Sequence, residues 1–349
     1  MNIKKLVKQN VYELLAYDVK EIPCRTKLDA NESPYGLPPD MLRLGDVQAL
    51  LSGLNRYPDS QAKGLKKQVS RYFGINSENL LQGNGSDELI YYLITTFGGP
   101  VLYPVPTFSM YGIITRALNE TGIEVPLDED FDLDVEKILR AIKTKKPRII
   151  FLSSPNNPTG NCFSTERILR VVDITSRKSV VVVDEAYQPF AGKKGFIPVL
   201  KDYKNLVLMR TLSKIGLAGL RVGFLIADEE IINEVNKVRL PFNLNSLSQA
   251  IAKTVLSKRK VLDSRIKSIV SERDRLYEEM ATIKGVRPFP SEANFILFRV
   301  EDSNRVYSDL LKEGILVRNM KGVIENCLRV TVGTPEENRT FIDTLKEIV

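Results

Sequence analysis

Three short apolar runs are each followed by polar side chains whose types can do chemistry. SSPNNPTG (153–160) follows the first run, and its prolines and glycine predict an irregular loop that leaves the asparagine side chains free to bind. The second run leads into Asp184, Glu185 and Tyr187, and the third leads into Lys214. Each segment alone also fits a plain turn, a helix cap or a surface lysine. Their order and spacing decide between these interpretations.

The chain contains no histidine, which narrows the proton-transfer chemistry that these residues can support. Catalytic Ser–His and Cys–His pairs are excluded, the commonest metal ligand is missing, and no metal site is predicted. A lysine at the end of a buried strand can have a lowered pKa, and its amine is then available as a nucleophile. Cys24, Cys162 and Cys327 are too widely spaced for a metal motif or a disulfide framework, which favours a reducing cytoplasm.

The elements that must position these residues alternate between helix and strand from about residue 60. Apolar, β-branched runs predict strands buried on both faces of a parallel sheet at 100–103, 148–153, 180–184 and 206–210. Amphipathic patterns predict helices at 62–73, 87–97 and 164–176. Polar groups that follow parallel strands share one edge of the sheet, where open α/β folds bind ligands.

The C-terminal third has the pattern of an α+β domain. A long, charged helical stretch, 247–280, could connect two domains. Strands are predicted after it at 294–300 and 328–332, and helices at 303–313 and 335–348.

Composition excludes several classes of protein. The chain has 349 residues, 43% of them apolar and 27% charged, which allows a large core and a smaller domain. No stretch approaches the roughly 18 apolar residues of a membrane span, and the N-terminus is too polar for a secretory signal. Only one basic run, 143–148, is dense, and we expect it to be a solvated loop rather than a nucleic-acid site. The net charge of +7 therefore favours an anionic cofactor and anionic substrates.

The order and spacing of the polar segments, with GNGSDE (83–88) upstream, resemble the fold-type-I aminotransferases, which use pyridoxal 5′-phosphate (PLP). Further segments make nearly the whole chain similar to the histidinol-phosphate aminotransferases: LDANESPYG (28–36), NRYPD (55–59), PTFSMYG (106–112) and LRVTVGTPEEN (328–338).

The resemblance implies an α/β fold with two domains. A mostly parallel seven-stranded sheet flanked by helices is expected in the large PLP-binding domain, 46–255. A small α+β domain is expected from the C-terminal part, 256–349, joined by the N-terminal segment, 1–45.

The resemblance also implies the catalytic residues. Lys214 would carry PLP as a Schiff base and, once freed, would move the substrate proton. Asp184 would pair with the pyridine nitrogen, and Asn157 and Tyr187 would bind the phenolic oxygen. Phe108 would stack on the ring, an arrangement worth about 0.5–1.5 kcal/mol beyond area burial.

Five residues are implied at the cofactor phosphate. Gly85 and Ser86 would open a helix whose N-terminal amides attract an anion, and Ser213 and Arg221 would add a hydroxyl and a guanidinium. The step from Lys214 to Arg221 is one residue shorter than is usual in the family, so a tighter loop is expected. Tyr57 would reach the phosphate of the neighbouring subunit, which implies a homodimer with shared active sites. Asp87 is predicted to cap the helix.

Two arginines, Arg329 and Arg318, match the family residues that bind the acidic end of the substrate. The planar, forked guanidinium group of arginine suits a carboxylate or a phosphate. Tyr17 and Asn31 are expected as further substrate contacts. Three more residues could line the pocket or form structural pairs: Glu32, Arg25 and Tyr111.

The activity implied is transamination between L-histidinol phosphate and 2-oxoglutarate, giving imidazole acetol phosphate and glutamate in histidine biosynthesis. A broad aromatic amino-acid aminotransferase and a threonine-phosphate decarboxylase are the enzymatic alternatives. A regulatory module that binds PLP without catalysing a reaction is the remaining, non-enzymatic alternative. No nucleic-acid or membrane partner is expected.

Overall fold

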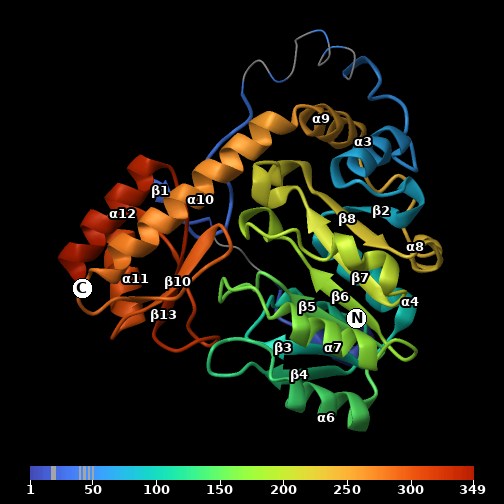
Figure 1. Ribbon diagram of the computed structural model, residues 1–349, viewed down its shortest axis with the longest axis horizontal. Helices are drawn as coiled ribbons and strands as arrows, with labels where there is room; N and C mark the ends of the chain where they lie inside the picture. Colours follow the sequence, from blue (N-terminus) through green and yellow to red (C-terminus); the bar gives the residue numbers. More distant parts are fainter. Residues whose placement is uncertain (17–20, 39–40, 42–44, 46–47, 49–50) are drawn as a thin grey trace.

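The large sheet contains seven strands in the order β2-β8-β7-β6-β5-β3-β4 (Figure 1). The computed structural model describes residues 1–16, 21–38, 41, 45, 48 and 51–349. β8 is antiparallel to both of its neighbours, and the other pairs in this sheet are parallel, so the predicted mostly parallel sheet is confirmed. The strands are β2 (Leu80–Asn84), β3 (Val101–Val105), β4 (Gly122–Pro126), β5 (Ile149–Ser153), β6 (Val180–Asp184), β7 (Leu206–Thr211) and β8 (Val222–Ala227).

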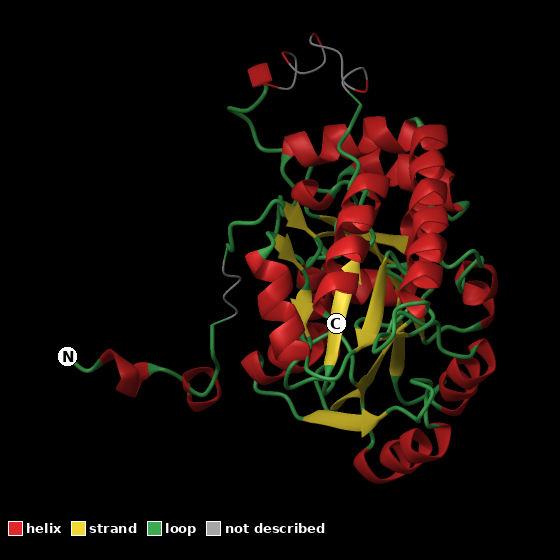
Figure 2. Ribbon diagram, turned by 90° about the vertical axis from the view of Figure 1, so that its left-hand side faces the viewer, coloured by secondary structure: helices red, strands yellow, loops and turns green. Residues whose placement is uncertain are grey.

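Helices cover both faces of this sheet because its strands are apolar on both sides (Figure 2). In β5, Ile149 and Phe151 join one buried cluster and Ile150 and Leu152 join another, as the alternation of side chains along a strand requires. The first cluster includes residues of α4 (Ser86–Phe97), α5 (Met110–Ala117) and α8 (Glu229–Asn236). The second includes residues of α3 (Lys63–Phe73), α6 (Val135–Lys145), α7 (Thr165–Ile174) and α9 (Ser246–Ser257).

A second, antiparallel sheet of four strands lies in the C-terminal part, in the order β12-β13-β10-β9. Near the N-terminus β1 pairs in parallel with β11, so the N-terminal segment is hydrogen-bonded to the C-terminal part. The strands are β1 (Thr26–Lys27), β9 (Arg287–Pro288), β10 (Phe295–Arg299), β11 (Ile315–Leu316), β12 (Arg318–Asn319) and β13 (Cys327–Thr331). The remaining α-helices are α1 (Gln9–Tyr12), α10 (Arg259–Ala281), α11 (Ser303–Lys312) and α12 (Pro335–Ile348). The 3-10 helices are η1 (Ile3–Leu6), η3 (Ser77–Asn79), η4 (Gln188–Phe190), η5 (Ile197–Asp202), η6 (Ser213–Ile215) and η7 (Ala218–Leu220).

Two predictions about helices are wrong in detail. The stretch 247–280 forms two helices, α9 and α10, because Lys258 has backbone angles of φ −103° and ψ 47° and separates them. The basic run 143–148 is exposed, as expected, except at the buried Pro147, but residues 143–145 form the end of α6 rather than a loop. Within the described residues, no helix combines the length and apolar character that crossing a bilayer requires.

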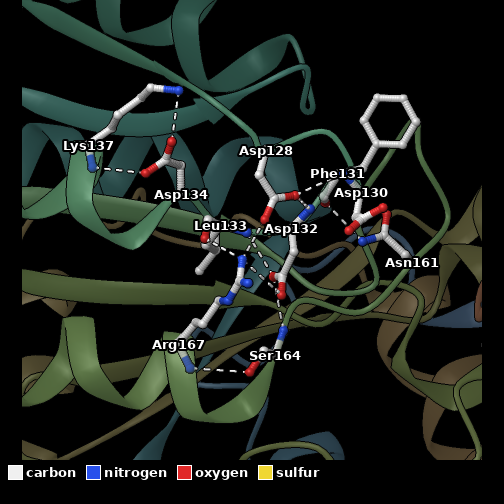
Figure 3. Close-up of polar contacts among 10 residues, drawn as sticks. All are labelled: Asp128, Asp130, Phe131, Asp132, Leu133, Asp134, Lys137, Asn161, Ser164 and Arg167. Atoms are coloured by element: carbon white, nitrogen blue, oxygen red, sulfur yellow. Dashed lines mark hydrogen bonds and ion pairs between the residues drawn. The ribbon is translucent and has the colours of Figure 1, made fainter.

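The loop between β4 and α6 is rich in aspartate, and it contacts Arg167 of α7 and Asn161, the residue that follows the 153–160 segment (Figure 3). Arg167 Nη1 of α7 contacts Asp128 Oδ2 at 2.6 Å and Asp132 Oδ2 at 3.4 Å. Asn161 Nδ2 donates to the carbonyl oxygen of Phe131 at 2.9 Å. These aspartates are thus bound by protein groups, and the loop is fastened to the end of the 153–160 segment.

Candidate active site

A pocket lies at the carboxyl edge of the large sheet, between the ends of β5, β6 and β7 and the start of α4. Ser153, Asp184 and Thr211 are the last residues of these strands, and each contributes to the pocket wall. The lining residues are Ser86, Asp87, Phe108, Ser153, Asn157, Asp184, Ala186, Tyr187, Thr211, Ser213, Lys214 and Arg221. The three polar segments of the sequence therefore meet in one place.

Asp184 is nearly fully buried in the pocket wall, with 4% of its surface exposed. Its Oδ2 accepts a hydrogen bond from the Tyr111 hydroxyl at 2.7 Å, and its Oδ1 accepts one from the N–H of Ala186 at 3.0 Å. Burial raises the pKa of Asp184 to about 6, and the two hydrogen bonds oppose this shift. A carboxylate in this setting is suited to bind a cationic N–H group.

Lys214 lies in η6, immediately beyond the end of β7. Its Nζ donates to the carbonyl oxygen of Ala30 at 3.4 Å and lies 5.6 Å from the centroid of the Tyr187 ring. The neighbouring Ser213 is fixed by Thr211, whose Oγ1 donates to Ser213 Oγ at 2.9 Å and accepts the Ser213 N–H at 3.1 Å. The amine is therefore presented from the end of a buried strand, next to an aromatic ring.

The first turn of α4 and Arg221 form a site suited to an anion. Gly85 is the N-cap at φ 83°, and no side chain of the described part of the chain caps this helix. A Cβ on Gly85 would lie 2.6 Å from Arg221 Nη2, so only glycine allows the guanidinium to come this close. The uncapped N–H groups and the helix dipole favour a phosphate at this end.

The shorter step from Lys214 to Arg221 still brings both residues to the pocket. Arg221 achieves this with a left-handed backbone conformation, φ 52°, at the end of η7. Its Nη2 contacts Asp87 Oδ2 at 3.3 Å. The prediction that Asp87 caps the helix is wrong, because its carboxylate faces this guanidinium instead.

A hydrogen-bonded network links the pocket to the N-terminal and C-terminal parts of the chain. Asn31, almost fully buried, donates from Nδ2 to the Tyr187 hydroxyl at 2.9 Å. Arg329 Nη1 donates to Asn157 Oδ1, and its Nη2 donates to the carbonyl oxygen of Asp29 at 2.7 Å. The predicted substrate residues Asn31 and Arg329 therefore contact two residues of the pocket wall.

The structure does not bring Tyr57 or Arg318 into this pocket. Tyr57 is 81% exposed and stacks on Phe242, with ring centroids 4.5 Å apart. Arg318 is exposed and is the cross-strand partner of Arg329, so both lie on one face of the small sheet. Tyr17 lies outside the described residues.

Glu32 and Arg25 each bind another group of the protein, as the structural alternative expected. Glu32 binds Lys27, with Oε2 and Nζ 2.9 Å apart, and Arg25 donates to the carbonyl oxygen of Glu313 at 2.8 Å.

Known proteins resemble this chain over almost its full length. The sequence model of the family "Aminotransferase class I and II" matches residues 25–345. A histidinol-phosphate aminotransferase of Aquifex aeolicus (strain VF5) is 45% identical over 352 residues, which span 99% of this chain and 98% of that protein. This chain belongs to the class I and II aminotransferases.

Solved structures agree with this family. The histidinol-phosphate aminotransferase from Clostridium acetobutylicum has a TM-score of 0.86 at 27% identity, over 93% of this chain and 98% of that one. The histidinol-phosphate aminotransferase from Sinorhizobium meliloti in complex with PLP has a TM-score of 0.87, over 98% and 97%. Its identity is 22%, so it bears on the fold. The predictions of an α/β aminotransferase and of PLP as its cofactor are confirmed.

The pocket of this aminotransferase fits PLP chemically. Asp184 offers a buried carboxylate for a ring N–H, and Asn157 and Tyr187 offer polar groups beside it. Because Gly85 has no Cβ, the guanidinium group of Arg221 can lie close to the N-terminus of α4, where a phosphate binds well. The donors thus match the two ends of the cofactor.

Sequence reasoning missed or undervalued several residues of the site. Ser153 and Thr211 end the same strands that carry the predicted residues, and their positions could have identified them. Tyr111 was left open between a pocket residue and a structural pair, and it binds Asp184 across 73 residues of sequence. No local pattern indicates a contact of that range.

Proposed function

We propose that this chain transfers the amino group of L-histidinol phosphate to 2-oxoglutarate, giving imidazole acetol phosphate and glutamate in histidine biosynthesis. The observation that carries the proposal is the meeting of Lys214 and Asp184 in one pocket, with Arg329 bonded to Asn157 beside them. The 45% identity to a histidinol-phosphate aminotransferase supports the choice of substrate.

Lys214 and Asp184 have the central chemical roles. Bound PLP supplies the electron sink that stabilises negative charge on the substrate α-carbon. Lys214 would hold the cofactor through its amine and, once free, would carry the proton that leaves the substrate α-carbon. Asp184, as an anion, would keep a proton on the ring nitrogen of the bound cofactor.

Hydrogen bonds within the protein determine which groups of Tyr187 and Asn157 are left to donate to the phenolic oxygen of the cofactor. The Tyr187 hydroxyl accepts from Asn31, so its own proton is left to donate elsewhere. Asn157 Oδ1 accepts from Arg329, which leaves the Nδ2 group of Asn157 to donate. Tyr187 and Asn157 are therefore both oriented as donors.

The phosphate end is assigned to α4, Ser213 and Arg221. Ser213 Oγ accepts from Thr211, so its hydrogen is available to a phosphate oxygen. Gly85 and Ser86 provide the N–H groups of the first turn, and Arg221 adds a charge-assisted hydrogen bond.

The acidic end of the substrate is assigned to Arg329 and Arg318, which share one face of the small sheet beside the pocket. Both half-reactions use one site, so the same arginines must bind the phosphate of histidinol phosphate and a carboxylate of glutamate. Tyr17 and Asn31 are proposed as further contacts, and Phe108 as the aromatic ring that stacks on the cofactor.

A homodimer with shared active sites is part of the proposal. Tyr57, Phe242 and Leu240 are apolar side chains exposed on the surface, at 81%, 40% and 62%, and two of them stack. If a second copy of the chain covers these side chains, Tyr57 of one subunit would lie at the phosphate site of the other.

The proposed domain division is 1–45, 46–255 and 256–349. The three free cysteines support a cytoplasmic location.

A spectral titration separates this proposal from its alternatives. The PLP-loaded protein is mixed with histidinol phosphate, glutamate, phenylalanine and threonine phosphate, and transfer of the amino group to the cofactor is followed by absorbance. We expect fast transfer from histidinol phosphate and glutamate. Fast transfer from phenylalanine would favour a broad aromatic aminotransferase, and release of CO₂ from threonine phosphate would indicate a decarboxylase.

A further inference from the structure

Tyr111 is a fully buried tyrosine whose hydroxyl group hydrogen-bonds to Asp184 of the pocket wall. It lies in α5, stacks on Phe151 of β5 with ring centroids 4.7 Å apart and planes 8° apart, and has no exposed surface. Its hydroxyl donates to Asp184 Oδ2 at 2.7 Å. The ring of Phe108 packs edge-on against it at 5.7 Å. Tyr111 therefore contacts both Asp184 and the aromatic residue of the pocket.

The hydrogen bond matters because the other influences on Asp184 oppose its charge. Burial is the largest, and the carboxylates of Asp87 and Glu185 add repulsion, so all three raise the pKa of Asp184. The two groups that lower it are the Tyr111 hydroxyl and the N–H of Ala186. Of these, Tyr111 is the one that a side-chain substitution can remove. Burial beside Asp184 raises the pKa of Tyr111 well above its usual value, so the phenol stays neutral and remains a donor.

We propose that Tyr111 is a positioning residue that keeps the proton shared by Asp184 and the cofactor ring nitrogen on the nitrogen. A carboxylate that accepts a hydrogen bond is a weaker base, so the proton that it shares with the ring stays on the ring. A protonated ring is the better electron sink. The inference rests on the proposed role of Asp184.

The test measures the ring nitrogen directly. Apoprotein is loaded with PLP that carries ¹⁵N at the ring nitrogen, and the ¹⁵N chemical shift is followed from pH 6 to pH 10. The proteins are the wild type, Tyr111→Phe, Asp184→Asn, the double variant, and Tyr103→Phe as a matched control. Tyr103 is also buried, its ring centroid lies 6.3 Å from that of Tyr111, and its hydroxyl contacts Glu124 at 3.3 Å rather than Asp184.

We expect Tyr111→Phe to move the shared proton toward Asp184, so that at a fixed pH the ¹⁵N chemical shift moves toward that of an unprotonated ring; the ratio of the two protonation states should change by about ten- to a hundred-fold, the size of a hydrogen bond to a charged group. Asp184→Asn should leave the nitrogen unprotonated throughout, and adding Tyr111→Phe to it should change nothing further, because Tyr111 acts through Asp184. Tyr103→Phe should match the wild type.

Four results would overturn the proposal. A wild-type shift in Tyr111→Phe, together with a changed shift in Asp184→Asn, would reduce Tyr111 to core packing. An equal effect of Tyr103→Phe would show a general loss of structure. An unchanged shift in Asp184→Asn would also remove the proposed role of Asp184. If Tyr111→Phe does not fold, 3-fluorotyrosine at position 111 donates more strongly and must move the ¹⁵N chemical shift at a fixed pH toward that of a protonated ring, and no such movement would overturn the proposal.

Discussion

Lys214 is the residue on which the proposed chemistry depends most. It extends from the end of β7 into the pocket, where the described residues include no histidine that could act as the base. We expect Lys214→Ala to abolish turnover and to leave PLP bound without a covalent bond. Removal of the proton-transfer group alone costs about 10²–10⁴-fold in rate. Borohydride reduction of the loaded wild type and peptide mapping identify the lysine, and label on the exposed Lys194 or any other lysine would contradict the assignment.

Asp184 should give the cofactor-free protein a pH-dependent stability. Its folded pKa of about 6 lies above the ordinary 3.8, so folding favours the protonated form. Its contribution is therefore fully present below about pH 4 and is lost as the pH rises through about 6, by roughly 3 kcal/mol in total.

Asp184→Asn should remove this loss. The free energy of unfolding of the variant, minus that of the wild type, should rise by up to roughly 3 kcal/mol between pH 4 and pH 7. Urea denaturation of both apoproteins at several pH values measures it. A difference that stays constant with pH would show that Asp184 does not titrate in this range.

At the scale of elements, a buried ion pair joins the ends of β6 and β7, which carry Asp184 and Lys214. Arg210 Nη2 and Glu185 Oε2 are 2.7 Å apart, with side chains 7% and 1% exposed. Glu185 Oε1 also accepts the N–H of Phe196 at 2.8 Å. A Cβ on Gly195, at φ 64°, would lie 2.1 Å from Glu185 Oε1, so the loop over this pair requires glycine.

Breaking this pair should be costly. Arg210→Met leaves the Glu185 carboxylate buried without its partner and should lower the free energy of unfolding by about 3–5 kcal/mol. The double variant Glu185→Gln, Arg210→Met should recover most of the loss. Arg259→Met, which breaks an exposed pair with Asp263, is the control and should cost less than about 1 kcal/mol. Chemical denaturation compares them, and equal losses for the two arginines would contradict the account.

Local patterns in the sequence predicted most of the elements that carry the pocket. The β-branched runs form β5, β6 and β7, and GNGSDE contains the start of α4. Both features depend on residues that are close in the sequence, so a local pattern can predict them. The antiparallel β8 between β2 and β7 was not foreseen, since strand direction depends on how a distant loop returns. The contact of Tyr111 with Asp184 was not predictable for the same reason.

At the scale of the whole molecule, Tyr57 tests whether active sites are shared. If Tyr57 binds the phosphate of the neighbouring subunit as proposed, Tyr57→Phe should weaken PLP affinity about ten-fold or more without unfolding the chain, because that hydroxyl hydrogen bond would be lost. Mixed dimers of Tyr57→Phe and Lys214→Ala subunits should place both lesions in one site and leave the other intact. Their activity should approach half that of the wild type. Activity no higher than the mean of the parental dimers would contradict sharing.

The central claim is that this aminotransferase acts on histidinol phosphate, and a comparison of kcat/KM for histidinol phosphate, histidinol and phenylalanine tests it most directly. If Arg329 and Arg318 bind the acidic end of the substrate as proposed, a neutral hydroxymethyl group would lose their charged hydrogen bonds. Charged hydrogen bonds contribute about 1.5–3 kcal/mol each, so histidinol should be poorer by roughly two to four powers of ten. Phenylalanine should be a slow substrate. If phenylalanine equals or exceeds histidinol phosphate, the claim is wrong and the chain is a broad aromatic aminotransferase.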